Sequence, residues 1–369
     1  LVLTVYRGTA NENRVYYRPV EGGGDFVRLL DEADARYEFV GNQGRLFYFH
    51  TDLDAPRGRI IAVDITDPAR QACREILPQQ ADAIDYVAMV NHQLVVVYLH
   101  DVSSLVKVYS LDGTYVRRID LPGVGTVGNL TGRCADTEMF FVFSSFLFPG
   151  TVYRYDFETD RLSVHFQPRM DFDFSAYQTE QVFYRSRDGT RVPMFITHRK
   201  GLVRDGSHPT LLYGYGGFGI SLKPRFSSSV LFWLEHGGVY AVATIRGGGE
   251  YGLAWHRAGM LDKKQNVFDD FLAAAEWLIA HGYTRPKKLA IRGASNGGLL
   301  VAACMVQRPE LFGAVICQVP VTDMLRYHKF TVGRYWIPEY GNAENSREEF
   351  QTLFAYSPLH HVRAGRRYP

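Results

Sequence analysis

The hexapeptide Gly293-Ala294-Ser295-Asn296-Gly297-Gly298 carries the clearest chemical signal in the sequence. It stands between an apolar run typical of a strand, Lys288 to Arg292, and one typical of a helix, Leu299 to Val306. A serine on a sharp strand-to-helix turn holds its hydroxyl above the sheet, and flanking glycines let strand and helix approach closely. At the helix N-terminus, free amides and the helix dipole stabilise a developing oxyanion. The pattern predicts that Ser295 is the nucleophile of an acyl-transfer reaction, and a purely structural turn is the alternative.

The elements that would position this serine alternate between strands and helices. We predict a helix from Val267 to His281, with apolar residues on one stripe and Gly282 at the left-handed position that ends it. Four continuous apolar runs predict strands buried on both faces of a mostly parallel sheet: Leu211 to Tyr213, Val239 to Ile245, Lys288 to Arg292 and Ala314 to Val319.

Residues 1 to about 170 show a different pattern, short β-runs separated by turns. Tyr17, Val63, Tyr109 and Tyr155 recur at a constant spacing of 46, and each closes an apolar run. A period in the forties with about four strands per unit is typical of propeller blades. We therefore expect about four blades here, with further blades before Leu1; a β-sandwich with accidental spacing is the alternative.

Composition limits the remaining classes. The chain has 369 residues, of which 46% are apolar and 22% are charged, and this composition fits a globular protein of about two domains. Its net charge of only +2 gives no long-range electrostatic field that would attract nucleic acid or a membrane. No apolar run is long enough for a membrane helix. Four widely spaced cysteines indicate neither a disulfide framework nor a zinc site. Gly247-Gly248-Gly249 lacks the context of a phosphate site and predicts a tight loop, so we expect no cofactor and no metal.

Ordered motifs across residues 170–369 resemble the prolyl oligopeptidase family of serine peptidases. The motifs are Leu212 to Phe218, Ile245 to Gly252, Lys264 to Asn266 followed by Phe268 to Phe271, Gly293 to Gly298, and Tyr340-Gly341 followed by Tyr356 to Leu359. The resemblance implies an α/β-hydrolase catalytic domain, with a mostly parallel sheet and helices on both faces, beside a seven-bladed propeller. Residues 171–369 would form the first, without its C-terminal part, and residues 1–170 part of the second.

The same resemblance assigns roles to individual residues. Ser295 would be the nucleophile, with the Asn296 amide and the Tyr215 hydroxyl as oxyanion donors, although a structural role for Tyr215 stays open. An apolar pocket for proline would be lined by Phe218, Val321, Val332, Trp336 and Tyr340. Phe218 and Trp336 could instead be ordinary core residues.

Selectivity for basic residues is the competing specificity. The related oligopeptidase B, which selects Lys or Arg, looks like a member with carboxylates where Trp336 and Pro338 stand here. That difference favours selectivity for proline over selectivity for basic residues. Glu339 is the one acidic residue of this stretch that could still bear on the choice.

The acid and the histidine of the triad are expected beyond Pro369, because in this fold both follow the nucleophile. Asp323 and the histidines at positions 328, 360 and 361 were the in-chain candidates. We interpret Asp323 as a helix cap, and His328, His360 and His361 as surface or loop residues.

The resulting expectation is a serine endopeptidase that cleaves short peptides after proline, with residues 1–369 alone inactive. We expect short proline-containing peptides as partners, a monomer when full-length, and a cytoplasmic location. A periplasmic or secreted protein stays open, because any targeting segment would precede Leu1. The alternatives are an esterase or acylaminoacyl-type hydrolase, and a noncatalytic binding protein.

Overall fold

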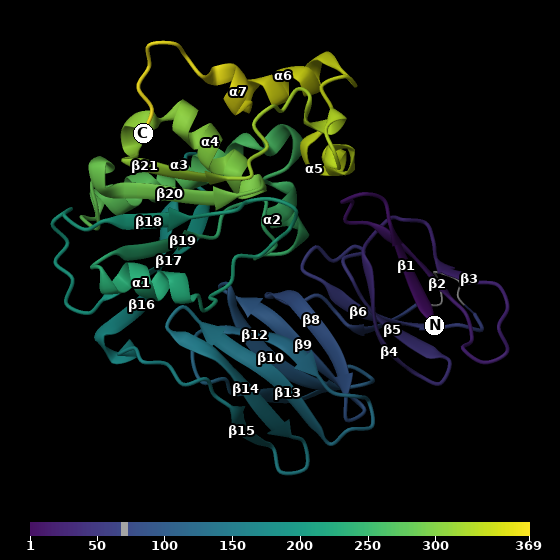
Figure 1. The fold of residues 1–369 in the computed structure, drawn as a ribbon. Coiled ribbons are helices and arrows are strands. Elements are labelled where there is room, and N and C mark those ends of the chain that lie inside the picture. The colour runs from purple at the N-terminus through teal and green to yellow at the C-terminus, as the bar shows by residue number, and fades with distance from the viewer. Residues whose placement is uncertain (68–72) are drawn as a thin grey trace. The chain divides into compact units, whose positions relative to one another are not determined.

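The computed structural model describes residues 1–67 and 73–369. The chain divides into two compact units (Figure 1). The first comprises Leu1–Phe143, Gly150–Pro168 and Tyr251–Ala254, and the second comprises Ser144–Pro149, Arg169–Glu250 and Trp255–Pro369. Within the described ranges, no helix is long and apolar enough to cross a membrane.

The described strands up to residue 166 form antiparallel sheets that follow one another along the chain. The first sheet has three strands: β1 (Val2–Tyr6), β2 (Asn13–Tyr17) and β3 (Val27–Leu30). The second consists of β4 (Tyr37–Gln43), β5 (Leu46–Thr51), β6 (Arg59–Asp64) and β7 (Arg74–Leu77). The third consists of β8 (Ala83–Val90), β9 (Gln93–His100), β10 (Ser103–Ser110) and β11 (Tyr115–Ile119). The fourth consists of β12 (Thr126–Thr131), β13 (Glu138–Ser145), β14 (Phe148–Asp156) and β15 (Arg161–Phe166).

The 46-residue period corresponds to this repetition. Its four marker residues lie on β2, β6, β10 and β14, which are the last strand but one of each sheet. Neighbouring sheets share apolar cores: Val15 and Leu30 of the first pack with Phe49 and Ile61 of the second. Stacked sheets that bury faces only against their neighbours are the arrangement that the period predicts.

A six-stranded sheet forms the centre of the second unit, in the order β16-β17-β19-β18-β20-β21. Its parallel part pairs β19 with β18, β18 with β20 and β20 with β21, whereas β16 and β17 are antiparallel additions. The strands are β16 (Tyr177–Arg185), β17 (Arg191–Arg199), β18 (Thr210–Tyr213), β19 (Val239–Ala243), β20 (Leu289–Ala294) and β21 (Ala314–Gln318).

Helices cover both faces of this sheet, as expected. Alternate residues of β19 point to opposite faces: Val239 and Ala241 join the core formed with α3 and α4, whereas Tyr240 packs in the cluster that contains α1. The helices are α1 (Ser228–Glu235), α2 (Leu253–Arg257), α3 (Gln265–Ala280), α4 (Asn296–Gln307), α5 (Ile337–Tyr340), α6 (Arg347–Tyr356) and α7 (Pro358–His361).

Within residues 1–369, the strand predicted at residues 314–319 is not buried on both faces. β21 forms at nearly this range, but it is the edge strand of the sheet and most of its residues are exposed, including Ile316 at 42%. A continuous apolar run indicates a strand that is buried when both neighbours are present, and β21 pairs on one side only.

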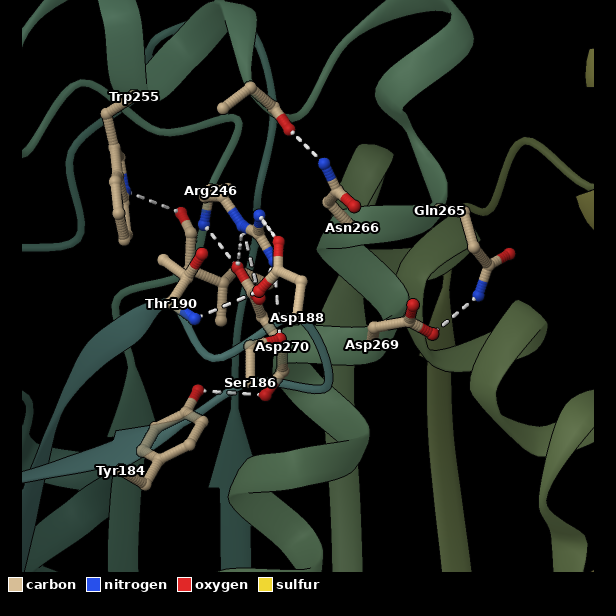
Figure 2. Close-up of polar contacts among 12 residues, drawn as sticks. Tyr184, Ser186, Asp188, Thr190, Arg246, Trp255, Gln265, Asn266, Asp269 and Asp270 are labelled. Carbon is tan, nitrogen blue, oxygen red and sulfur yellow. Dashed lines mark hydrogen bonds and ion pairs between the residues drawn. The ribbon is translucent and has the colours of Figure 1, made fainter.

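The loop after β19 is fixed by a buried ion pair (Figure 2). Arg246 and Asp270 are 4% and 0% exposed, and two guanidinium nitrogens donate to the carboxylate, with Nη2 2.6 Å from Oδ1. The Arg246 amide donates to the same carboxylate at 3.0 Å. Burial alone would lower the pKa of Arg246, but hydrogen bonds to Asp270 and Asp188 raise it and keep the guanidinium charged. Helix α3 therefore holds the start of the Gly247–Gly249 run.

Glu250 closes the same loop as a buried acid. It is 1% exposed; its Oε1 accepts the Leu222 amide at 2.7 Å, and its Oε2 has no hydrogen-bond partner. Burial raises its pKa from the usual 4.5 to about 7, although the Leu222 amide and the charge of Lys223 act in the opposite direction. The loop thus begins at an ion pair whose charged groups are hydrogen-bonded to each other. It ends at Glu250, where burial disfavours the charged form of the carboxyl group.

Replacement of Asp270 with Ala should destabilise the protein by about 3–5 kcal/mol, because the buried Arg246 charge loses its buried partner and keeps only the half-exposed Asp188. Asp269→Ala is the matched control on the same helix; Asp269 is only partly buried and contacts Gln265, so its loss should cost less than about 1 kcal/mol. Urea unfolding measures both, and equal effects would contradict the assignment.

Glu250 should make the protein less stable as the pH rises from 4.5 to 7. Because its pKa is raised in the folded state, the folded protein binds more protons than the unfolded chain in this window, and stability falls by about 3 kcal/mol across it. Glu250→Gln should abolish this component, whereas Glu235→Gln, at an exposed site, should leave it unchanged. The measurement is the free energy of unfolding against pH; an unaltered slope in Glu250→Gln would refute the prediction.

Candidate active site

Ser295 lies on the predicted sharp turn. Strand β20 ends at Ala294 and helix α4 begins at Asn296, which confirms the predicted order of strand, turn and helix. The serine has φ 58° and ψ −118°, a conformation that is strained for a residue with a side chain. Ser295 is exposed, and although it occupies the N-cap position its side chain makes no capping hydrogen bond. The hydroxyl is therefore presented above the helix N-terminus.

The glycines of the motif are explained by close backbone contacts. A Cβ on Gly298 would lie 2.6 Å from the carbonyl oxygen of Gln318 on β21, and a Cβ on Gly293 would overlap the carbonyl of Gly297. The Ser295 amide donates to the same Gln318 carbonyl at 3.0 Å. The turn is thus packed between its own helix and the neighbouring strand, which sustains the strained conformation.

Tyr215 meets this turn from the loop after β18. Burial raises the pKa of its phenol above the usual range, and a hydrogen bond with the Ser295 side chain acts in the opposite direction. The phenol thus stays protonated at neutral pH and can donate a hydrogen bond. A neutral donor beside Ser295 is suited to stabilising an oxyanion.

The Asn296 side chain ties this loop to the elbow. Asn296 is 1% exposed; its Nδ2 donates to the Tyr215 carbonyl at 2.6 Å, and its Oδ1 accepts the Tyr340 hydroxyl at 2.9 Å. Its backbone amide is the first of helix α4, where an amide has no intrahelical acceptor. The two predicted oxyanion donors are therefore joined by one buried amide group.

The second glycine run packs against the Tyr215 loop. The Gly219 amide donates to the Gly247 carbonyl at 3.0 Å, and a Cβ on Gly247 would lie 2.6 Å from the Gly216 carbonyl oxygen. Gly247 and Gly216 both have positive φ, 87° and 66°. This contact agrees with the interpretation of Gly247-Gly248-Gly249 as a tight loop, and it places the loop beside the one that carries Tyr215.

The predicted pocket residues are only partly brought together. The Phe218 and Tyr340 rings meet edge to face with centroids 5.5 Å apart, and Trp336 stacks on Tyr327, which in turn contacts Tyr340. Val321 packs on the same apolar core. Val332 is 51% exposed and lies outside that core. Tyr340 is 2% exposed, so its ring lies under the site, and the pocket roles of all five residues stay predictions.

Glu339 is not an acidic group open to a substrate. It is 2% exposed, its Oε2 lies 2.7 Å from His256 Nε2, and its Oε1 lies 3.3 Å from Lys264 Nζ. Burial would raise the pKa of Glu339, but the charge of Lys264 and the hydrogen bond with His256 lower it below the usual range. Sequence reasoning missed this cluster, since its members are separated by up to 83 residues.

The in-chain candidates for an acid and a base are engaged elsewhere. Asp323 binds the Arg326 guanidinium at 2.6 Å and accepts the Arg326 amide, so it closes a turn. His328 lies 3.2 Å from Glu344, and both His360 and His361 contact Ser357. Within residues 1–67 and 73–369, no group of three or more His, Cys, Asp or Glu side chains is placed to hold a metal ion.

Two family models match the chain. The model described as the prolyl oligopeptidase family matches residues 224–369, and that of the prolyl oligopeptidase N-terminal beta-propeller domain matches residues 1–168. Prolyl endopeptidase of Elizabethkingia miricola is 40% identical over 369 residues, which are 100% of this chain and 52% of the relative.

Solved structures give the same result. A structure from a study of two prolyl endopeptidases and their inter-domain dynamics is 51% identical with a TM-score of 0.95, and the match covers 100% of this chain and 54% of the other. Prolyl oligopeptidase B from Galerina marginata, bound to a 25mer macrocyclization substrate, is 36% identical with a TM-score of 0.95, covering 100% and 52%. The chain therefore spans about half the length of the relatives it matches. Its propeller-type sheets, its hydrolase sheet with the serine elbow and its matches to both family models show that the chain belongs to the prolyl oligopeptidase family.

Proposed function

We propose that the full-length protein is a serine peptidase that cleaves short peptides on the carboxyl side of proline. The observation that carries this proposal is the exposed hydroxyl of Ser295 on a strained elbow, together with the partly buried Tyr215 phenol, whose pKa the Ser295 side chain influences. The relatives named prolyl endopeptidase supply the substrate class.

In the proposed reaction, the Ser295 hydroxyl attacks the carbonyl carbon of a prolyl residue. The carbonyl oxygen gains negative charge, and the Asn296 amide and the Tyr215 hydroxyl donate hydrogen bonds to it. The serine proton passes to a general base and then to the departing amine, leaving an acyl-enzyme. Water, deprotonated by the same base, releases the acid and regenerates the serine.

Proline selectivity is supported by the apolar residues near Tyr340. Phe218 and Trp336 are partly buried aromatic residues that pack on the core, and such walls suit a rigid pyrrolidine ring that has no amide hydrogen to satisfy. The only acidic side chain of the stretch from Tyr335 to Tyr340 is Glu339, and its buried pairing with Lys264 and His256 argues against recognition of Lys or Arg.

The general base must come from outside residues 1–369 in this proposal. All twelve histidines lie in the described part of the chain, and none of them is hydrogen-bonded to Ser295 there; the buried His256, for example, is bound to Glu339. A serine without a base is a poor nucleophile. Residues 1–369 alone should therefore be nearly inactive.

The remaining features of the proposal concern the whole protein. The propeller would restrict access to short peptides, the full-length protein would be a monomer, and its location would be cytoplasmic. Esterase or acylaminoacyl-type activity and noncatalytic binding are the competing functions. A substrate comparison separates them.

Tyr215→Phe should lower kcat on a chromogenic peptide with proline before the leaving group by about 10²–10³-fold, with KM little changed, because the lost hydroxyl acts on the developing oxyanion. Ser295→Ala should lower it by about 10⁴-fold or more. The measurement is steady-state hydrolysis by the full-length protein.

Tyr213→Phe is the matched control, since Tyr213 lies two residues earlier at the end of β18 and is likewise partly buried. It should retain wild-type kcat. Equal hydrolysis of alanine and proline peptides, or hydrolysis of esters alone, would overturn the proposed specificity, and full activity of Tyr215→Phe would overturn the proposed oxyanion donor.

A further inference from the structure

Lys264 is a buried cation that the mechanism above does not use. Its side chain is 1% exposed at the start of α3. Its Nζ donates to the Gly216 carbonyl at 2.8 Å and to Glu339 Oε1 at 3.3 Å, and lies 5.3 Å from the centroid of the Tyr340 ring. Burying an ammonium group is unfavourable unless it is paired and hydrogen-bonded, and Lys264 meets both conditions.

Both partners of this ion pair hold the loop that carries the candidate oxyanion donor. Lys264 Nζ donates to the Gly216 carbonyl, and the Phe218 amide helps to stabilise the charged form of the Glu339 carboxylate, which lowers its pKa. We call residues 215–218 the oxyanion loop. The loop is under backbone constraint, because Gly216 and Phe218 have positive φ of 66° and 58°.

Further hydrogen bonds link α5 and Asn296 to the oxyanion loop near Ser295. Next to Glu339 on α5, Tyr340 donates to Asn296 Oδ1, and Asn296 Nδ2 donates back to the Tyr215 carbonyl. The oxyanion loop is therefore fixed at its Tyr215 end by Asn296, and at Gly216 and Phe218 by the ion pair. His256 supplies a further contact to Glu339 at 2.7 Å.

We propose that the buried Lys264–Glu339 ion pair positions the oxyanion loop, so that the Tyr215 hydroxyl is held where the oxyanion forms beside Ser295. The inference rests on the acyl-transfer function proposed above and assigns positioning roles to two residues. Neither contacts the reacting atoms: Lys264 acts through the Gly216 carbonyl and Glu339 through the Phe218 amide.

The test is a double-mutant cycle on the full-length protein. Lys264→Met should lower kcat on the prolyl peptide by about 10- to 100-fold with little change in KM, because a misplaced donor loses transition-state stabilisation. In the Tyr215→Phe background the same change should alter kcat by less than about 2-fold, since the group it positions is already absent. Equal fold-losses of kcat in both backgrounds would overturn the inference, as would an unchanged kcat in the single variant.

Two further variants separate positioning from folding. Lys263→Met, at the exposed neighbouring position, should retain wild-type kcat. The double variant Lys264→Met/Glu339→Gln removes both charges and avoids leaving a buried carboxylate unpaired. It should unfold at a temperature close to that of the wild type and still show the loss in kcat; a wild-type kcat in this variant would overturn the proposal.

The rate of covalent labelling of Ser295 by a fluorophosphonate distinguishes this inference from the proposed function. Labelling depends on the nucleophile and the oxyanion donors but not on proline recognition. A wild-type protein that is labelled but cleaves no prolyl peptide would refute the proposed specificity, and slower labelling of Lys264→Met would still support the inference. The inference would be overturned if the wild type and Lys264→Met were labelled at equal rates, or if the wild type were not labelled at all.

Discussion

The buried amide of Asn296 is the contact on which the geometry near Ser295 depends. Its two hydrogen bonds connect three segments that lie far apart in the sequence: the loop after β18, the N-terminus of α4, and α5. An amide donates and accepts at once, so one side chain satisfies the Tyr215 carbonyl and the Tyr340 hydroxyl. A buried polar network of this kind is stable only when each member is satisfied, and both the amide nitrogen and the amide oxygen of Asn296 are hydrogen-bonded.

The surrounding loops show why glycine and buried charge occur together here. A Cβ at any glycine of the runs at 214, 216 and 217 and at 247–249 would lie closer than 3.0 Å to a neighbouring atom, and at Gly247 that atom is the Gly216 carbonyl oxygen of the other run. Glycine-rich loops have little apolar side-chain area with which to pack on the core, so polar contacts set their positions. Arg246 with Asp270 holds one loop, and Lys264 with Glu339 holds the other.

The sequence allowed the local part of this arrangement to be predicted. The elbow at Ser295, the strand before it and the helix after it follow from residues within twenty positions, and the propeller-type repeat follows from a constant spacing. The buried ion pairs could not be predicted in this way. Lys264 and Glu339 are 75 positions apart, and nothing in either segment identifies the partner.

Two particular residues illustrate this limit. Glu339 is the acidic residue of the stretch where a related member that selects basic residues carries carboxylates, but its position in the sequence says nothing about burial, and the structure pairs it with Lys264 and His256. Ile316 belongs to an apolar run that is typical of a buried strand, yet within residues 1–369 β21 has a neighbour on one side only, and Ile316 is exposed. In both cases burial depends on segments that are distant in the sequence, and local spacing does not reveal them.

The most direct test of this account is kcat of full-length Asn296→Ala on a short prolyl peptide. The variant keeps the backbone amide that would bind the oxyanion and removes only the side chain that joins Tyr215 to Tyr340. The account predicts that kcat falls by about 10²-fold while KM changes little, because both donors lose their fixed relation. A wild-type kcat would contradict it, since the Asn296 side chain would then be dispensable for placing the oxyanion donors.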